Sequence, residues 1–274
     1  MFHDRLGCSS ISFRHLPLGE ALATMVGLGF EEIDLGALPG VCDHVPFELT
    51  DADIEGVAAR VTESGLRVRS LNGDIGDLNA VLDDDVLAAR EAHLDRLLTL
   101  TERVGAKALV LPCGALSPDP ERSLEQDLDL VAEQLAAAAE RAAGFGVELW
   151  TESLHFYRLC GTLDRALALA GRLDGTTVRH VVDLSHVVAS GGHPEEAIRS
   201  LAGRMAHVHL RDAVPGNINL SVGNGAVDFA SALEALRDAD FDGHFSLELE
   251  AHDLTHEERP AAAAKAGSFI SDLI

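Results

Sequence analysis

The sequence predicts a single-domain (β/α)8 barrel that spans residues 1–274. Short runs rich in Val, Ile and Leu alternate with longer amphipathic segments along the whole chain, the pattern of strand and helix repeating around a parallel sheet. Eight such units in a chain of 274 residues match the usual size of this barrel. The strands are expected at residues 5–11, 31–35, 66–72, 107–112, 147–152, 178–183, 205–210 and 245–250.

The segments between these strands have helical spacing and helical end signals. Leu128, Val131 and Leu135 recur at three or four residues, which puts them on one face of a helix. Thr50 followed by Asp53 has the spacing of a capping box at a helix start. Glycines that suit a helix C-cap of positive φ precede five of the strands, namely Gly29, Gly65, Gly105, Gly146 and Gly243. An open doubly wound sheet is the minor alternative, and the first strand lacks the Gly-x-Gly-x-x-Gly turn of a dinucleotide site.

Charge and composition exclude several classes of function. The chain carries 45 Asp and Glu against 21 Lys and Arg, a net charge of -24, which disfavours nucleic acid and anionic membrane surfaces as partners. No signal peptide or membrane-spanning run is recognisable, so we expect a cytoplasmic protein. The four scattered cysteines indicate neither a disulfide framework nor a zinc knuckle. Lys107 and Lys265 lie away from any expected active site, which disfavours Schiff-base chemistry, whereas 13 histidines favour metal or acid/base chemistry.

Polar side chains end four successive strands of the predicted barrel. They are Glu152, Asp183, His209 and Glu248. In a (β/α)8 barrel the C-terminal ends of the strands surround the active site. Three carboxylates that converge there would repel one another without a cation, and together with the imidazole they suit a divalent ion. The sequence therefore predicts one bound metal, of which Mn²⁺, Mg²⁺, Co²⁺ and Zn²⁺ are the candidates.

Longer motifs around these residues resemble the xylose-isomerase-like TIM barrel family over essentially the whole chain. They are Thr151-Glu152, Asp183-Leu184-Ser185-His186, His207-Val208-His209-Leu210-Arg211-Asp212, Gly223-Asn224-Gly225-Ala226-Val227-Asp228-Phe229 and Gly243-His244-Phe245-Ser246-Leu247-Glu248. The resemblance implies a catalytic divalent metal on Glu152, Asp183, His209 and Glu248. It also implies that His186 contacts a substrate oxygen. Oligomers are common in such families, so a homo-oligomer is expected as well.

The two-residue period of a strand predicts where the neighbours of these residues point. His207 should lie one layer below the metal as a hydrogen-bonded core histidine, and Arg211 just above it. Arg211 either pairs with Asp212 on a solvated loop or reaches substrate oxygens. Glu250, of the same parity as Glu248, is either a residue of the barrel mouth or a solvated one. In the lower layers we expect Glu148 to pair with Arg179.

The loops after the strands offer further candidates for the barrel mouth. His155 and His44 are expected to bind substrate, beside the possible mouth residues His15 and Asn72. Possible apolar walls are Phe13, Phe47, Phe156 and Tyr157. The Gly223-Asn224-Gly225 segment reads as a turn rather than a phosphate-binding nest, because no lysine lies near it.

These residues fit a metal-dependent isomerase or epimerase of a ketose or related polyhydroxy ketone. The metal would polarise adjacent oxygens, and Glu152 and Glu248 would act as base and acid. A dehydratase of the inosose dehydratase kind, which expels a hydroxyl, needs nearly the same residues. An apurinic endonuclease is disfavoured because the net negative charge of the chain repels DNA. The resembling endonucleases also carry Asp-x-His after the seventh strand, where this chain has Asn217-Ile218-Asn219. A non-catalytic metal-binding subunit is the remaining alternative.

Overall fold

A computed structural model describes residues 2–274 and shows a closed barrel of eight parallel strands. The strands follow the order β1-β10-β7-β6-β5-β4-β3-β2 around the barrel. They are β1 (Leu6–Ser9), β2 (Glu32–Ala37), β3 (Arg67–Gly73), β4 (Ala108–Pro112), β5 (Glu148–Glu152), β6 (Arg179–Asp183), β7 (Met205–Leu210) and β10 (His244–Leu247). The predicted (β/α)8 fold is therefore confirmed.

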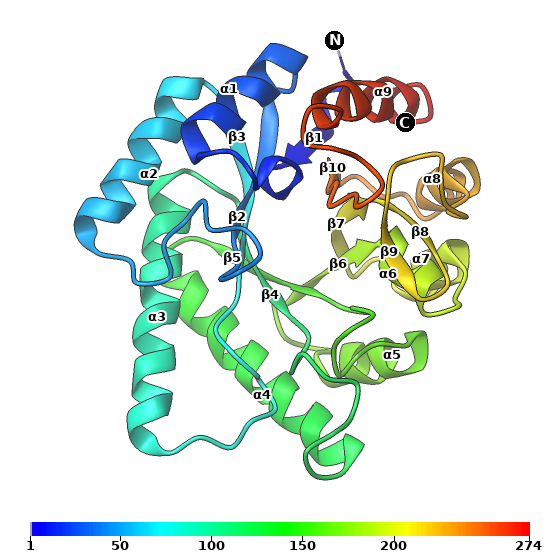
Figure 1. The fold of residues 1–274 in the computed structure, drawn as a ribbon. Coiled ribbons are helices and arrows are strands. Elements are labelled where there is room, and N and C mark those ends of the chain that lie inside the picture. Colours follow the sequence, from blue (N-terminus) through cyan, green and yellow to red (C-terminus); the bar gives the residue numbers. More distant parts are fainter. Residues whose placement is uncertain (1) are drawn as a thin grey trace.

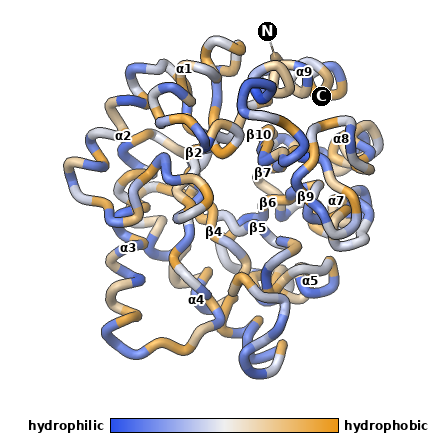
Figure 2. The backbone as a smooth tube through the Cα atoms, viewed as in Figure 1, coloured by the Kyte–Doolittle hydropathy of each residue, from blue (hydrophilic) through white to orange (hydrophobic). Residues whose placement is uncertain are grey.

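Helices form a ring around this barrel (Figure 1). They are α1 (Leu18–Leu28), α2 (Asp51–Ser64), α3 (Asp84–Arg103), α4 (Leu124–Ala143), α5 (Leu163–Arg172), α6 (Leu184–Ala189), α7 (Pro194–Ser200), α8 (Phe229–Asp238) and α9 (Arg259–Ser271). Hydrophobic and hydrophilic residues alternate along them (Figure 2), because one face of each packs on the strands. Among residues 2–274, no helix combines the length and the apolar character needed to cross a membrane.

The local end signals are confirmed with one exception. Thr50 and Asp53 form the expected capping box at the start of α2. Gly29, Gly65, Gly105 and Gly146 have positive φ. Gly243 is needed for a different reason, since a Cβ there would lie 2.4 Å from the carbonyl oxygen of Ala206.

Strand boundaries differ from the prediction at the first and last strands. β1 ends at Ser9, where Ser9 caps a short 3₁₀ helix (Ser10–Phe13). β10 ends at Leu247, so Glu248 follows the strand instead of lying within it. A two-stranded antiparallel ribbon of β8 (Asp212–Val214) and β9 (Asn217–Leu220), which was not predicted, extends from β7 over the barrel mouth.

The expected pairing of Glu148 with Arg179 is wrong. Glu148 accepts a hydrogen bond from Trp150 Nε1 (2.8 Å) and lies 3.3 Å from Lys107 Nζ. Arg179 instead donates to the carbonyl oxygens of Arg204 and Met205. The strand register explains the difference, because Arg179 lies opposite Trp150, two residues above Glu148.

Asp212 organises the loop between β9 and α8. Its buried carboxylate accepts hydrogen bonds from the backbone N–H groups of Ala213, Gly223, Gly225 and Val227, at 2.8, 2.8, 3.0 and 3.1 Å. A Cβ at Gly225 would lie 2.2 Å from Asp212 Oδ1, which explains the glycine. The turn interpretation of this segment is therefore supported, since the protein's own carboxylate fills the concavity that an anion would use. The expected alternative pairing of Arg211 with Asp212 is wrong.

We predict that Asp212→Ala lowers the free energy of unfolding by about 2–4 kcal/mol, because it strips several backbone donors of their acceptor. Urea denaturation followed by circular dichroism measures this change. Asn224→Ala is the matched control in the same loop, and its effect should stay within about 0.5 kcal/mol, since that side chain is exposed. Equal effects of the two substitutions would contradict the assigned role of Asp212.

Candidate active site

The structure brings together the four side chains predicted at the strand ends. Glu152 ends β5, Asp183 ends β6, His209 lies one residue before the end of β7, and Glu248 follows β10. In the strand register, Asp183 of β6 and Ser246 of β10 both lie opposite His209 of β7. The ends of these three strands therefore reach the same level of the barrel. Each of the four offers a ligand atom, and these atoms lie within 4.8 Å of one another.

Several polar atoms of this cluster are buried without a hydrogen-bond partner. They are Glu152 Oε1 and both ring nitrogens of His209. His209 Nδ1 lies 3.5 Å from Glu248 Oε2 and 3.8 Å from Glu152 Oε1. Buried polar atoms are rarely left unsatisfied, because desolvation without a partner is costly. Unused carboxylate and imidazole donors that face one point are consistent with a divalent metal site.

Asp183 is fixed by its own surroundings. It caps α6, and its Oδ1 accepts hydrogen bonds from the Ser185 N–H (2.7 Å) and the Ser185 hydroxyl (2.6 Å). Its Oδ2 accepts one from Arg211 Nη2 at 2.8 Å. These contacts hold the carboxylate in one orientation beside the other three side chains.

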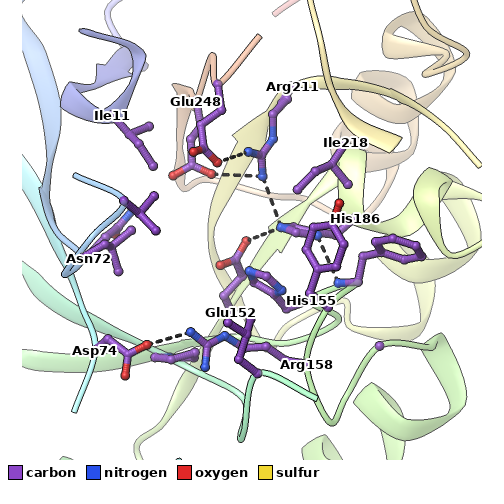
Figure 3. A pocket seen from close by; sticks show the side chains of 18 of the residues that line it. Ile11, Asn72, Asp74, Glu152, His155, Arg158, His186, Arg211, Ile218 and Glu248 are labelled. Atoms are coloured by element: carbon purple, nitrogen blue, oxygen red, sulfur yellow. Dashed lines mark hydrogen bonds and ion pairs between the residues drawn. The ribbon is translucent and has the colours of Figure 1, made fainter. Parts of the chain in front are cut away.

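Arg211 lies within the cluster and is only 1% exposed. Besides Asp183, its guanidinium contacts Glu250 Oε2 at 2.6 Å and lies 3.4 Å from Glu248 Oε2. Glu250 also accepts a hydrogen bond from Arg14 at 2.5 Å, so it belongs to the mouth of the barrel. Arg211 therefore supplies positive charge among the carboxylates (Figure 3).

The environment sets different pKa values for the two glutamates. Burial raises the pKa of Glu248 to about 7, against the opposing effect of His209 and Arg211. Burial also acts to raise the pKa of Glu152, but the nearby imidazoles of His209, His155 and His186 outweigh it and lower that pKa. One cavity thus holds two carboxyl groups of unequal acidity.

His186 and His155 form an adjacent wall (Figure 3), with ring centroids 3.9 Å apart. His186 Nδ1 accepts a hydrogen bond from the Phe156 N–H (3.0 Å), and its Nε2 lies 3.6 Å from Glu152 Oε1. Burial lowers the pKa of both histidines to about 3, so both imidazoles are neutral near pH 7. Neutral rings here can exchange hydrogen bonds with a polar ligand.

These residues border a cavity of about 1020 Å³, which falls in the size range of small-molecule sites. Of the loop candidates, Asn72, His155, Phe156 and Tyr157 line it. His44 does not, because its Nδ1 contacts Cys42 Sγ and its Nε2 contacts the carbonyl oxygen of Leu16. His15, Phe13 and Phe47 are likewise absent from the described lining of this cavity.

Two features of this end of the barrel escaped the sequence reasoning. Asp74 and Arg158, from the loops after β3 and β5, form an ion pair of 2.7 Å across the cavity wall. Asp34, a fully buried residue of β2, accepts a hydrogen bond from His207 at 2.8 Å. The signal for Asp34 was an acidic residue between the apolar Ile33 and Leu35 of the same strand. His207 is buried one layer down, as expected.

The chain is similar in sequence to one sugar epimerase and in fold to others. It is 26% identical to the L-ribulose 3-epimerase of Mesorhizobium japonicum over 255 residues, which is 90% of this chain and 80% of that protein. Among solved structures, 3-keto-D-glucoside 4-epimerase from E. coli matches with a TM-score of 0.76 and 22% identity, over 98% of this chain and 99% of that one. D-psicose 3-epimerase from Clostridium cellulolyticum, solved with D-tagatose, matches with a TM-score of 0.80 and 16% identity over the same shares.

The two structures share the fold with this chain. The model of the xylose isomerase-like TIM barrel matches residues 21–273. This match covers all the strands except the first, together with the four residues at the strand ends. The chain therefore belongs to the xylose isomerase-like TIM barrel family.

Proposed function

We propose that this protein is a divalent-metal-dependent epimerase or isomerase of a ketose or related polyhydroxy ketone, and that it acts by proton transfer through Glu152 and Glu248. The observation that carries the proposal is the meeting of these two carboxylates in one buried cluster with Asp183 and His209. Glu152, Asp183, His209 and Glu248 would hold the metal. When bound, the metal would act as a Lewis acid on adjacent ketone and hydroxyl oxygens of the substrate, which acidifies the neighbouring C–H.

Glu152 and Glu248 reach the cluster from different directions. In the barrel, β5 and β10 are separated by β6 and β7, so the two carboxylates approach a bound ligand from either side of the Asp183–His209 pair. One carboxylate takes the proton from carbon and the other returns a proton to the opposite face, which inverts that carbon. Return to the neighbouring carbon would instead interconvert a ketose and an aldose.

Arg211, His186 and His155 would bind the oxygens of the substrate. Arg211 has a rigid array of N–H donors, and the neutral imidazole of His155 offers one donor and one acceptor. His186 offers only a donor at Nε2, because its Nδ1 already accepts a hydrogen bond from the Phe156 N–H. Arg211 and His186 are buried, and His155 is partly buried beside them. Glu152 and Glu248 themselves line the cavity, so a proton held on either carboxylate can exchange with solvent between turnovers. His44, held by Cys42 and Leu16, has no part in this arrangement.

The first prediction from this proposed function concerns the metal. Purified protein should contain one divalent ion per chain, and both Asp183→Ala and His209→Ala should lose most of it, because each removes a donor from a site of four. Elemental analysis after gel filtration measures the metal content. Glu148→Gln, at the opposite end of β5, is the control that should keep the metal. Equal metal content in all four proteins would remove the claim.

A second prediction concerns the reaction. In heavy water, turnover of a ketose or inosose should place deuterium on the carbon beside the ketone. Glu152→Gln should reduce this exchange by at least about a hundredfold, because the amide keeps the shape but cannot accept a proton. Glu148→Gln should exchange at the wild-type rate.

The fate of the label separates the reaction classes. Product without solvent deuterium would exclude the proton route in favour of a hydride shift. Deuterium accompanied by loss of water would identify a dehydratase. Mass spectrometry and proton NMR of the product distinguish these outcomes.

A third prediction concerns Arg211. Arg211→Lys keeps the charge but removes the fork of donors that contacts Asp183 and Glu250. We expect kcat/KM to fall at least about tenfold while the bound metal is retained. Steady-state kinetics and elemental analysis of the same preparation check this. Loss of metal in parallel with activity would show that Arg211 serves the metal site instead.

A further inference from the structure

Asp34 is a buried carboxylate that the proposed reaction does not use. It lies on β2 inside the barrel with 0% exposure. Its Oδ2 accepts a hydrogen bond from His207 Nε2 at 2.8 Å, and its Oδ1 accepts one from the Ser70 hydroxyl at 2.8 Å. Burying a carboxylate is costly even when it is paired, which makes its presence in the barrel interior informative.

The same oxygen of Asp34 also faces a second histidine. His209 Nε2 lies 3.5 Å from Asp34 Oδ2, whereas His209 Nδ1, on the other side of the ring, faces Glu248 and Glu152. His209 therefore spans the space between Asp34 below and the strand-end carboxylates above. A carboxylate oxygen has two lone pairs, so Asp34 Oδ2 can accept from both histidines.

This geometry makes two positions compete for the ring proton of His209. Glu152 and Glu248 attract it to Nδ1, where it would block the lone pair that faces them. Asp34 attracts it to Nε2, which leaves the Nδ1 lone pair directed at the strand-end cluster. Histidines that bind metals commonly donate their other N–H to a carboxylate, which fixes the tautomer and the ring orientation.

We propose that Asp34 is a positioning residue that keeps the proton of His209 on Nε2 and so prepares Nδ1 to bind a divalent cation. The proposal rests on the metal centre described under the proposed function. His207 holds Asp34 in place, and its own ring packs on Trp150 with the ring centroids 5.6 Å apart. Asp34, His207 and Trp150 thus form a support that runs from the barrel interior to the metal site.

The closing experiment measures zinc affinity, by competition with a fluorescent chelator. Asp34→Asn should weaken Zn²⁺ binding about 10–100-fold, because the amide offers a poorer acceptor to two histidines. Ser70→Ala is the matched control: it removes a different hydrogen bond to Asp34 and should change the affinity less than about threefold. An Asp34→Asn variant that binds Zn²⁺ as tightly as the wild type would overturn the proposal.

A second measurement needs no variant of Asp34. In the Zn²⁺-loaded wild-type protein labelled with ¹⁵N-histidine, His209 should show zinc on Nδ1 and a proton on Nε2, with the signal identified by its loss in His209→Gln. Zinc on Nε2 would overturn the proposal even if Asp34→Asn fails to fold. A wild-type protein that binds no Zn²⁺, Mn²⁺ or Co²⁺ would overturn the metal centre and this inference together. Normal metal binding with an unaffected Asp34→Asn would overturn only the role of Asp34.

Discussion

Mutual repulsion among buried carboxylates is the constraint on which this end of the barrel depends. Glu152, Asp183 and Glu248 converge on one point, and Asp34 lies beneath them. Two like charges 4 Å apart repel by about 4 kcal/mol even at an effective dielectric constant of 20. Arg211 and His209 oppose this repulsion, but burial of the Glu248 carboxyl outweighs them and raises its pKa to about 7.

The barrel interior gives these charges a rigid base. Ala108, Val110, Trp150, Val181 and Ala206 pack together inside the strands, separately from the large core between strands and helices. The small neighbours leave room for the indole of Trp150, which lies two residues below Glu152 on β5. Because close-packed interiors deform little, this layer fixes the height and direction of the strand ends above it. The positions of the charged groups are thus determined largely by apolar packing.

Glu152, Asp183 and His209 could be predicted from the sequence because the parity and the end of a parallel strand are local properties. Glu248 could be preferred to Glu250, which has the same parity, only from the spacing to the preceding glycine that the family resemblance implies, since β10 ends at Leu247. Asp34 could not be predicted, because the sequence does not show that its side chain meets His207, 173 positions away, across the interior of the closed barrel. The failed pairing of Glu148 with Arg179 has a similar origin, since strand register depends on the stagger of the closed barrel. His44 shows the same limit for loops, whose side chains are directed by partners distant in sequence, such as Leu16.

Ion pairs between loops hold the wall of the cavity, whereas apolar packing holds the barrel interior beneath it. Arg14 pairs with Glu250 across 236 residues of sequence, and Asp74 pairs with Arg158 across 84. Each pair joins loops that follow different strands, and partial burial strengthens such pairs relative to fully exposed ones. In the proposed reaction, proton transfer and metal binding would use the strand ends, whereas the loops would supply the shape and polarity that select a substrate. This separation explains how one barrel can keep a constant reactive centre beneath a wall that differs from protein to protein.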